Sequence, residues 1–196
     1  MNLPNKLTVL RMVLIPFMMF FYLATFIPHG IGKIVALVIF VVAALTDLLD
    51  GKIARKYNLV TNLGKFLDPI ADKILTAAAL FMIMADGTIP APYGVIVVTI
   101  IIAREFMVSA LRLIAASQGT VLAADIWGKA KTMVQMIALP ILLFVPFLIE
   151  LGGVANWLVL TVKIVGWTAL GVATLLTIIS GANYLIKNRQ CFKDSK

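Results

Sequence analysis

Residues 46–72 read TDLLDGKIARKYNLVTNLGKFLDPIAD and hold four of the nine acidic residues of the chain. Asp47 and Asp50 are three positions apart, and Asp68 and Asp72 are four apart, so each pair shares one face of a helix. The segment between the pairs is short, which predicts two neighbouring antiparallel helices. The four carboxylates are therefore expected to converge.

The uncharged runs beside this stretch are too short to cross a membrane alone. A spanning helix needs about 20 residues, whereas the two runs cover only 34–46 and 74–85. They reach full length only if the helices continue through their charged neighbours. The aspartates are thus predicted to lie on membrane-spanning helices, near one membrane edge.

Composition supports a membrane setting for the whole chain. Of its 196 residues, 62% are hydrophobic and only 13% are charged, and the mean hydropathy is +1.04. Soluble domains are about 45–50% apolar and about 25% charged. We expect an all-α polytopic membrane protein with a single domain over 1–196. The predicted helices are 7–27, 33–54, 64–86, 91–116, 129–149 and 156–186.

The distribution of basic residues predicts the orientation of these helices. With both termini inside, all Lys and Arg residues except Lys33 and Lys163 fall on the cytoplasmic side, as the positive-inside rule requires. We therefore expect a multi-pass protein of the cell membrane with a cavity open to the cytoplasm. The net charge of +8 flanks apolar segments, so it favours lipid headgroups and phosphorylated substrates over nucleic acid.

Four carboxylates at membrane depth require compensating positive charge. Unpaired, they would cost on the order of 10 kcal/mol, and like charges close together also repel. Oxygen ligands select hard cations, so Mg²⁺ or Mn²⁺ is the expected partner, and two ions would suit a phosphoryl displacement. The alternative is pairing with basic side chains nearby, namely Lys52, Arg55, Lys65 and Lys73.

Small residues accompany the aspartates, at Gly51, Ala54 and Gly64. Such residues allow either close helix packing or the close approach of a ligand. The full spacing is Asp47-x2-Asp50-Gly51-x2-Ala54-Arg55-x8-Gly64-x3-Asp68-x3-Asp72. At every defined position it resembles the signature of the CDP-alcohol phosphatidyltransferase family.

The resemblance implies a fold of six transmembrane helices, usually as a homodimer, with a polar cavity open to the cytosol. It further implies that Asp47, Asp50 and Asp68 are ligands of a divalent-metal pair. Asp72 would be the general base that deprotonates the acceptor hydroxyl, and would also be a candidate metal ligand. A carboxylate beside a metal is usually a poor base, so Asp72 would have to be the least tightly coordinated of the four.

Other implied roles concern the CDP-lipid. Gly51 and Ala54 would let the cytidine lie against the helix, Arg55 would hold the nucleotide or its phosphates, and Gly64 belongs to the same expected site. Three residues near the N-terminus recur at a spacing of three positions, and we predict that they contact the CDP-lipid headgroup; helix capping is the alternative. They are Asn5, Thr8 and Arg11.

Further stretches resemble the branch of the family that uses glycerol 3-phosphate as acceptor. They are 3–11, 57–75, 102–106 and 127–132. This resemblance implies transfer of a phosphatidyl group from CDP-diacylglycerol to glycerol 3-phosphate. Sister enzymes with inositol phosphate, serine or phosphatidylglycerol as acceptor are the first alternative. A divalent-cation transporter is a remote one, because it needs polar residues along its whole path, whereas the outer halves of these helices are almost purely apolar.

Four basic residues are candidates for binding the phosphate of the acceptor. They are Arg104, Arg112, Lys129 and Lys131. Basic side chains that converge on a cavity are what a phosphate-bearing substrate requires. Ordinary anchoring at the cytoplasmic membrane surface is the alternative for all four.

Overall fold

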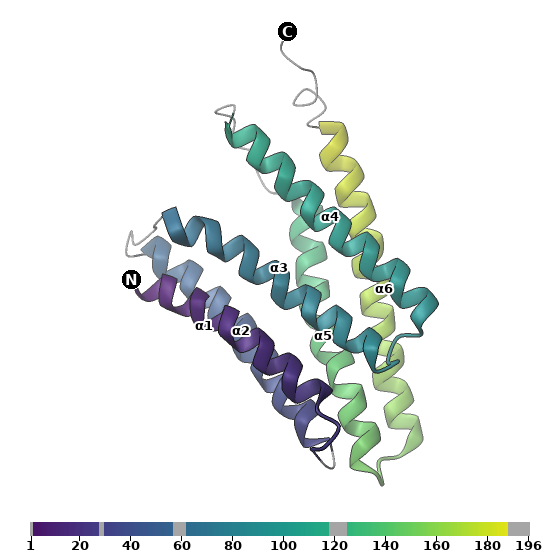
Figure 1. Cartoon of the computed structure of the whole chain (residues 1–196). Coiled ribbons are helices and arrows are strands. Elements are labelled where there is room, and N and C mark those ends of the chain that lie inside the picture. The colour runs from purple at the N-terminus through teal and green to yellow at the C-terminus, as the bar shows by residue number, and fades with distance from the viewer. Residues whose placement is uncertain (1, 28–29, 57–61, 118–124, 188–196) are drawn as a thin grey trace.

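The computed structural model describes residues 2–27, 30–56, 62–117 and 125–187, with backbone only for 3–4, 48–56, 62–63, 65–66 and 117. Within these ranges the chain is all-helical, as predicted (Figure 1). Its six helices are α1 (Leu3–Leu23), α2 (Ile31–Lys56), α3 (Asn62–Ala85), α4 (Ala91–Ser117), α5 (Ile126–Leu151) and α6 (Asn156–Lys187).

Every predicted helix is present, and four of them, α1, α2, α3 and α5, begin earlier than expected. α1 begins at Leu3 rather than at residue 7, since Asn2 is extended and a proline occupies the first turn, where its fixed φ favours a helix. α1 also ends at Leu23, where the amide of Ala24 donates to the carbonyl of Phe20. α5 begins at Ile126 because the carboxylate of Asp125 accepts the amide proton of Ile126.

Four helices in the described part of the chain are long and apolar enough to cross a membrane. The spans are Asn5–Leu23 in α1, Ala91–Ala116 in α4, Ile126–Leu151 in α5 and Asn156–Lys187 in α6. The remaining two, α2 and α3, carry the aspartate-rich stretch. The structure thus describes a helical bundle with membrane-length helices.

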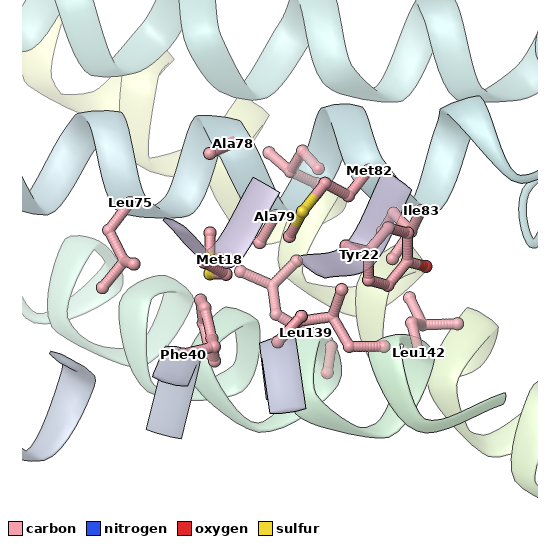
Figure 2. Close-up of a cluster of buried hydrophobic side chains, with 14 of the residues drawn as sticks. Met18, Tyr22, Phe40, Leu75, Ala78, Ala79, Met82, Ile83, Leu139 and Leu142 are labelled. Atoms are coloured by element: carbon pink, nitrogen blue, oxygen red, sulfur yellow. The ribbon is translucent and has the colours of Figure 1, made fainter. Parts of the chain in front are cut away.

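The core lies where α1, α2, α3 and α5 meet (Figure 2). Met18 and Tyr22 of α1 pack there with Phe40 of α2, and all three are almost completely buried. The labelled cluster is completed by side chains of α3 and α5, namely Leu75, Ala78, Ala79, Met82, Ile83, Leu139 and Leu142. Close van der Waals packing of this kind drives helix association in a bilayer, because lipid is as apolar as the side chains.

Two glycines let neighbouring helices approach closely. A Cβ atom at Gly32 of α2 would lie 2.3 Å from the carbonyl oxygen of Phe21 in α1. A Cβ atom at Gly166 of α6 would lie 2.6 Å from a methyl carbon of Leu142 in α5. Gly32 thus brings the backbones of α1 and α2 together, and Gly166 makes room for the side chain of Leu142 between α5 and α6, as small residues do in membrane helix pairs.

A network of polar contacts links several helices at the end of the bundle where α1 and α3 end. The hydroxyl of Tyr22 donates to Asp86, and Asp86 accepts the amide proton of Thr88 at 2.8 Å. The indole of Trp167 donates to the carbonyl of Thr88 at 3.0 Å, and the ammonium of Lys33 lies 4.0 Å from the ring centroid of Tyr22. The network therefore links α1, α2 and α6 to the segment between α3 and α4.

The alternating direction of the helices gathers the candidate functional residues at the opposite end. The first turns of α1, α3 and α5 lie at the same end of the bundle as the last turns of α2, α4 and α6 (Figure 1). The aspartates of α2 and α3 lie in the halves of their helices nearer this end, as do Arg112 of α4 and the basic residues of α5, while Arg104 lies at the middle of α4. The fold thus brings both predicted groups to one end.

Candidate active site

The first three turns of α1 bind two of the aspartates directly. The hydroxyl of Thr8 donates to Asp68 Oδ1 at 2.5 Å, and Nη1 of Arg11 donates to Asp47 Oδ1 at 2.5 Å. Thr8 and Arg11 are both completely buried. The sequence assigns the α1 residues to the CDP-lipid and the carboxylates to a metal. In the structure Thr8, Arg11, Asp47 and Asp68 form one group, which we call the aspartate cluster.

Arg11 is a counter-charge that sequence reasoning did not assign to the aspartates. The alternative to metal binding considered only basic residues close in sequence, whereas Arg11 lies 36 positions before Asp47. Among the described side chains, no three His, Cys, Asp or Glu residues are grouped so that they could hold a metal ion. The side chain of Asp50 lies outside the described part, so the four-aspartate metal site stays a prediction.

A cavity of about 790 Å³ opens beside this cluster, between α3, α4, α5 and α6. Asp72 of α3 belongs to its wall and is also within electrostatic reach of Asp47 and Arg11. Asp72 therefore connects the aspartate cluster with the cavity. The other charged residues of the wall are Lys73, Arg104, Glu105, Arg112, Asp125 and Lys129.

Glu105 is the central anion among the basic residues of the cavity. Its Oε1 accepts a hydrogen bond from the ammonium of Lys131 and lies 3.3 Å from Nη1 of Arg104. Lys131 is 2% exposed and does not belong to the cavity wall. Its charge is balanced by Glu105, so contact with an acceptor phosphate stays a prediction for Lys131.

Arg112 and Lys129 lie at more exposed positions of the same cavity. Nε of Arg112 donates to the hydroxyl of Tyr184 at 3.4 Å, and the guanidinium carbon lies 5.8 Å from the centroid of that ring. At the start of α5, Asp125 lies 3.5 Å from the ammonium of Lys187. The structure therefore places three of the four predicted phosphate-binding residues, Arg104, Arg112 and Lys129, on one wall.

The residues predicted to bind the CDP-lipid fall into two groups. Asn5, Thr8, Arg11 and Gly64 are buried at the aspartate end of the bundle. The side chains of Ala54 and Arg55, and the surroundings of Gly51, lie outside the described part of the chain. The structure therefore brings the first group to the carboxylates, and the roles of the second group stay predictions.

Sequence reasoning missed three hydroxyl residues that organise the cavity. The ammonium of Lys73 donates to Ser109, whose hydroxyl donates to the carbonyl of Glu105 at 2.8 Å. On α6, Ser180 accepts a hydrogen bond from Arg104, and Tyr184 contacts Arg112. Ser180 and Tyr184 are four positions apart, so the polar stripe that they form on an apolar helix was the available signal.

Comparison with known families agrees with this arrangement. The family model described as CDP-alcohol phosphatidyltransferase matches residues 1–179 of the 196. That range covers the aspartate cluster and all the charged residues of the cavity wall. The chain belongs to the CDP-alcohol phosphatidyltransferase family. The predicted family and enzyme class are thereby confirmed.

This phosphatidyltransferase has curated relatives of nearly its own length. It is 41% identical to a CDP-diacylglycerol–glycerol-3-phosphate 3-phosphatidyltransferase of Bacillus subtilis, with 99% of this chain and 98% of the relative covered. An enzyme of the same name from Rickettsia felis is 39% identical, with 93% of each chain covered. A probable phosphatidylglycerophosphate synthase of Mycobacterium tuberculosis is 36% identical, with 95% and 81% covered.

Proposed function

We propose that this phosphatidyltransferase moves the phosphatidyl group of CDP-diacylglycerol onto glycerol 3-phosphate, giving phosphatidylglycerophosphate and CMP. The names of the relatives support this reaction. The observation that carries it is the position of Asp72, between the aspartate cluster and a cavity wall that bears Arg104, Arg112 and Lys129. To react, a phosphorylated alcohol needs basic side chains that bind its phosphate and a nearby carboxylate that accepts the proton of its hydroxyl group.

The reaction exchanges the phosphoanhydride bond of the diphosphate for a phosphate ester bond to the acceptor. The primary hydroxyl oxygen of glycerol 3-phosphate attacks the phosphorus that carries the diacylglycerol. A new P–O bond forms to the acceptor, and the bond from this phosphorus to the oxygen of CMP breaks. The hydroxyl proton passes to the carboxylate of Asp72, and CMP leaves with the bridging oxygen.

Asp47, Asp50, Asp68 and Asp72 would hold one or two divalent cations, Mg²⁺ or Mn²⁺. The donors suit such ions because they are all carboxylate oxygens. When bound, the cations would neutralise the diphosphate and stabilise the departing CMP. Arg11 holds Asp47 in place, and Thr8 does the same for Asp68.

The basic wall of the cavity selects the acceptor. Arg104, Arg112 and Lys129 bind the phosphate of glycerol 3-phosphate and direct its free hydroxyl towards Asp72. Lys131 supports this wall through Glu105. Positioning and electrostatics of this kind supply most of the catalysis in phosphoryl-type transfers. An acceptor that lacks a phosphate, such as serine, would leave the basic wall without a phosphate to bind.

The membrane arrangement follows from the same proposal. All six helices span the bilayer of the cell membrane, α2 and α3 included, and the aspartate end and both termini face the cytoplasm. The positive-inside distribution supports this orientation, and it places the cavity where soluble glycerol 3-phosphate is available. The enzyme acts as a homodimer, as the family resemblance implies.

An acceptor panel tests the proposal. Purified enzyme in detergent receives CDP-diacylglycerol and Mg²⁺ with one acceptor at a time, and CMP release is followed. We expect release with glycerol 3-phosphate, and loss of that release when EDTA removes the metal. Release only with inositol phosphate, serine or phosphatidylglycerol would contradict the proposed acceptor. Full activity in EDTA would contradict the proposed metal dependence.

A further inference from the structure

Arg104 lies in a slot lined by three small residues, Gly128 of α5 and Ser180 and Gly181 of α6. A Cβ atom at Gly128 would lie 3.1 Å from Nη2 of Arg104 and 3.4 Å from Oγ of Ser180. A Cβ atom at Gly181 would lie 3.2 Å from Cγ of Arg104. We call these three residues the arginine slot. Its narrow fit fixes the path of the arginine side chain from α4 to α6.

Ser180 uses its hydroxyl differently from the threonines of the same helix. Four threonines of α6 each donate to the carbonyl four residues earlier: Thr161, Thr168, Thr174 and Thr177. Ser180 is completely buried and instead accepts a hydrogen bond from Nη2 of Arg104. The buried hydroxyl of Ser180 therefore forms a hydrogen bond between α4 and α6, whereas the threonine hydroxyls bond within α6.

The arginine slot and Glu105 hold the guanidinium from two sides. Nη2 donates to Ser180, and Nη1 lies 3.3 Å from Glu105 Oε1. Nε of Arg104 is buried without a hydrogen-bond partner among the described residues. A buried donor is costly unless a partner meets it. A guanidinium has five N–H donors, and Arg104 presents part of its side chain to the cavity.

We propose that Ser180 is a positioning residue for acceptor binding, which acts through Arg104 and touches neither substrate. It fixes the guanidinium so that the remaining donors meet the acceptor phosphate. This inference rests on the proposed function, in which Arg104 binds that phosphate. Gly128 and Gly181 contribute to the same positioning, because a Cβ atom at either would require the side chain of Arg104 to shift by a few tenths of an ångström.

Steady-state kinetics of Ser180→Ala test this role. We expect the KM for glycerol 3-phosphate to rise roughly tenfold, because a hydrogen bond to a charged group is lost. The KM for CDP-diacylglycerol should stay unchanged. Gly128→Ala should raise the KM for glycerol 3-phosphate as well, since its added methyl group pushes against the guanidinium. In an Arg104→Lys background, Ser180→Ala should add little further effect.

Two matched controls come from the same helix. Gly171→Ala adds a methyl group where no atom lies within 4 Å, and Thr177→Val removes a buried hydroxyl that bonds only within α6. Both should retain the wild-type KM values. Should Ser180→Ala unfold in detergent, Gly128→Ala carries the same test, because it removes no hydrogen-bonding group.

The outcomes separate this inference from the proposed function. A wild-type enzyme that releases no CMP with glycerol 3-phosphate contradicts the function; the variants are then compared on whichever phosphate-bearing acceptor it uses. Use of serine alone, which carries no phosphate, overturns the role of Ser180 as well. An equal rise in both KM values, an unchanged KM for the acceptor, or a full additional effect in the Arg104→Lys background would also overturn it.

Discussion

CMP release by Asp72→Asn is expected to fall by roughly 1,000-fold or more. Asparagine keeps the shape of the side chain but cannot accept the proton of the attacking hydroxyl, and general bases contribute about 10²–10⁴-fold to such reactions. The loss should appear in kcat, measured as CMP release at saturating glycerol 3-phosphate. The expected cause is the position of Asp72 on the cavity wall, within electrostatic reach of Asp47.

Glu150→Gln is the matched control for this variant. It also converts a carboxylate to an amide, but at an exposed position near the far end of α5. It should retain wild-type turnover, and both proteins should unfold at the wild-type temperature. If Asp72→Asn kept more than about a tenth of the activity, another group would have to be the base.

Glu105→Gln should lower the free energy of unfolding by about 3 kcal/mol, because it leaves the buried ammonium of Lys131 beside a neutral amide. Removing one partner of a buried ion pair typically costs about 3–5 kcal/mol, and Glu105 is only partly exposed, at 22% of its side chain. The measurement is chemical unfolding in detergent, followed by far-UV circular dichroism.

A double variant provides the internal control for that result. Glu105→Gln combined with Lys131→Met removes both charges of the pair, so no buried ammonium is left beside a neutral amide, and the cost of an uncompensated buried charge disappears. We expect the double variant to regain most of the lost stability. Equal stability of Glu105→Gln and wild type would show that the pair does not hold α4 against α5.

The sequence predicts the order of the helices and the end at which the charges gather. The pairs Asp47–Asp50 and Asp68–Asp72 indicate helix faces because side-chain periodicity along a helix is fixed. Turns depend on the local sequence in a similar way, because glycine tolerates positive φ without steric cost. Gly87, Gly152 and Gly153 all adopt positive φ. Helix ends were less predictable, since the start of α5 depends on one capping carboxylate.

Contacts between helices could not be predicted in the same way. α1 is apolar on most of its surface, so its pattern alone does not say which face meets α2 and α3. The pairs Arg11–Asp47 and Arg104–Ser180 join residues 36 and 76 positions apart. The burial of Lys131 is a similar case, because a lysine near the end of a membrane helix more often reaches the surface. Such contacts depend on how whole helices pack.

The most direct test of the central claim identifies the lipid product. Purified enzyme receives CDP-diacylglycerol, Mg²⁺ and glycerol 3-phosphate labelled with ¹³C at all carbons, and the extracted lipids are examined by mass spectrometry. We predict phosphatidylglycerophosphate that carries the complete labelled glycerol, formed in equal amount to CMP and absent with Asp72→Asn. Phosphatidic acid without label, formed in equal amount to CMP, would show that water is the acceptor and would contradict the account.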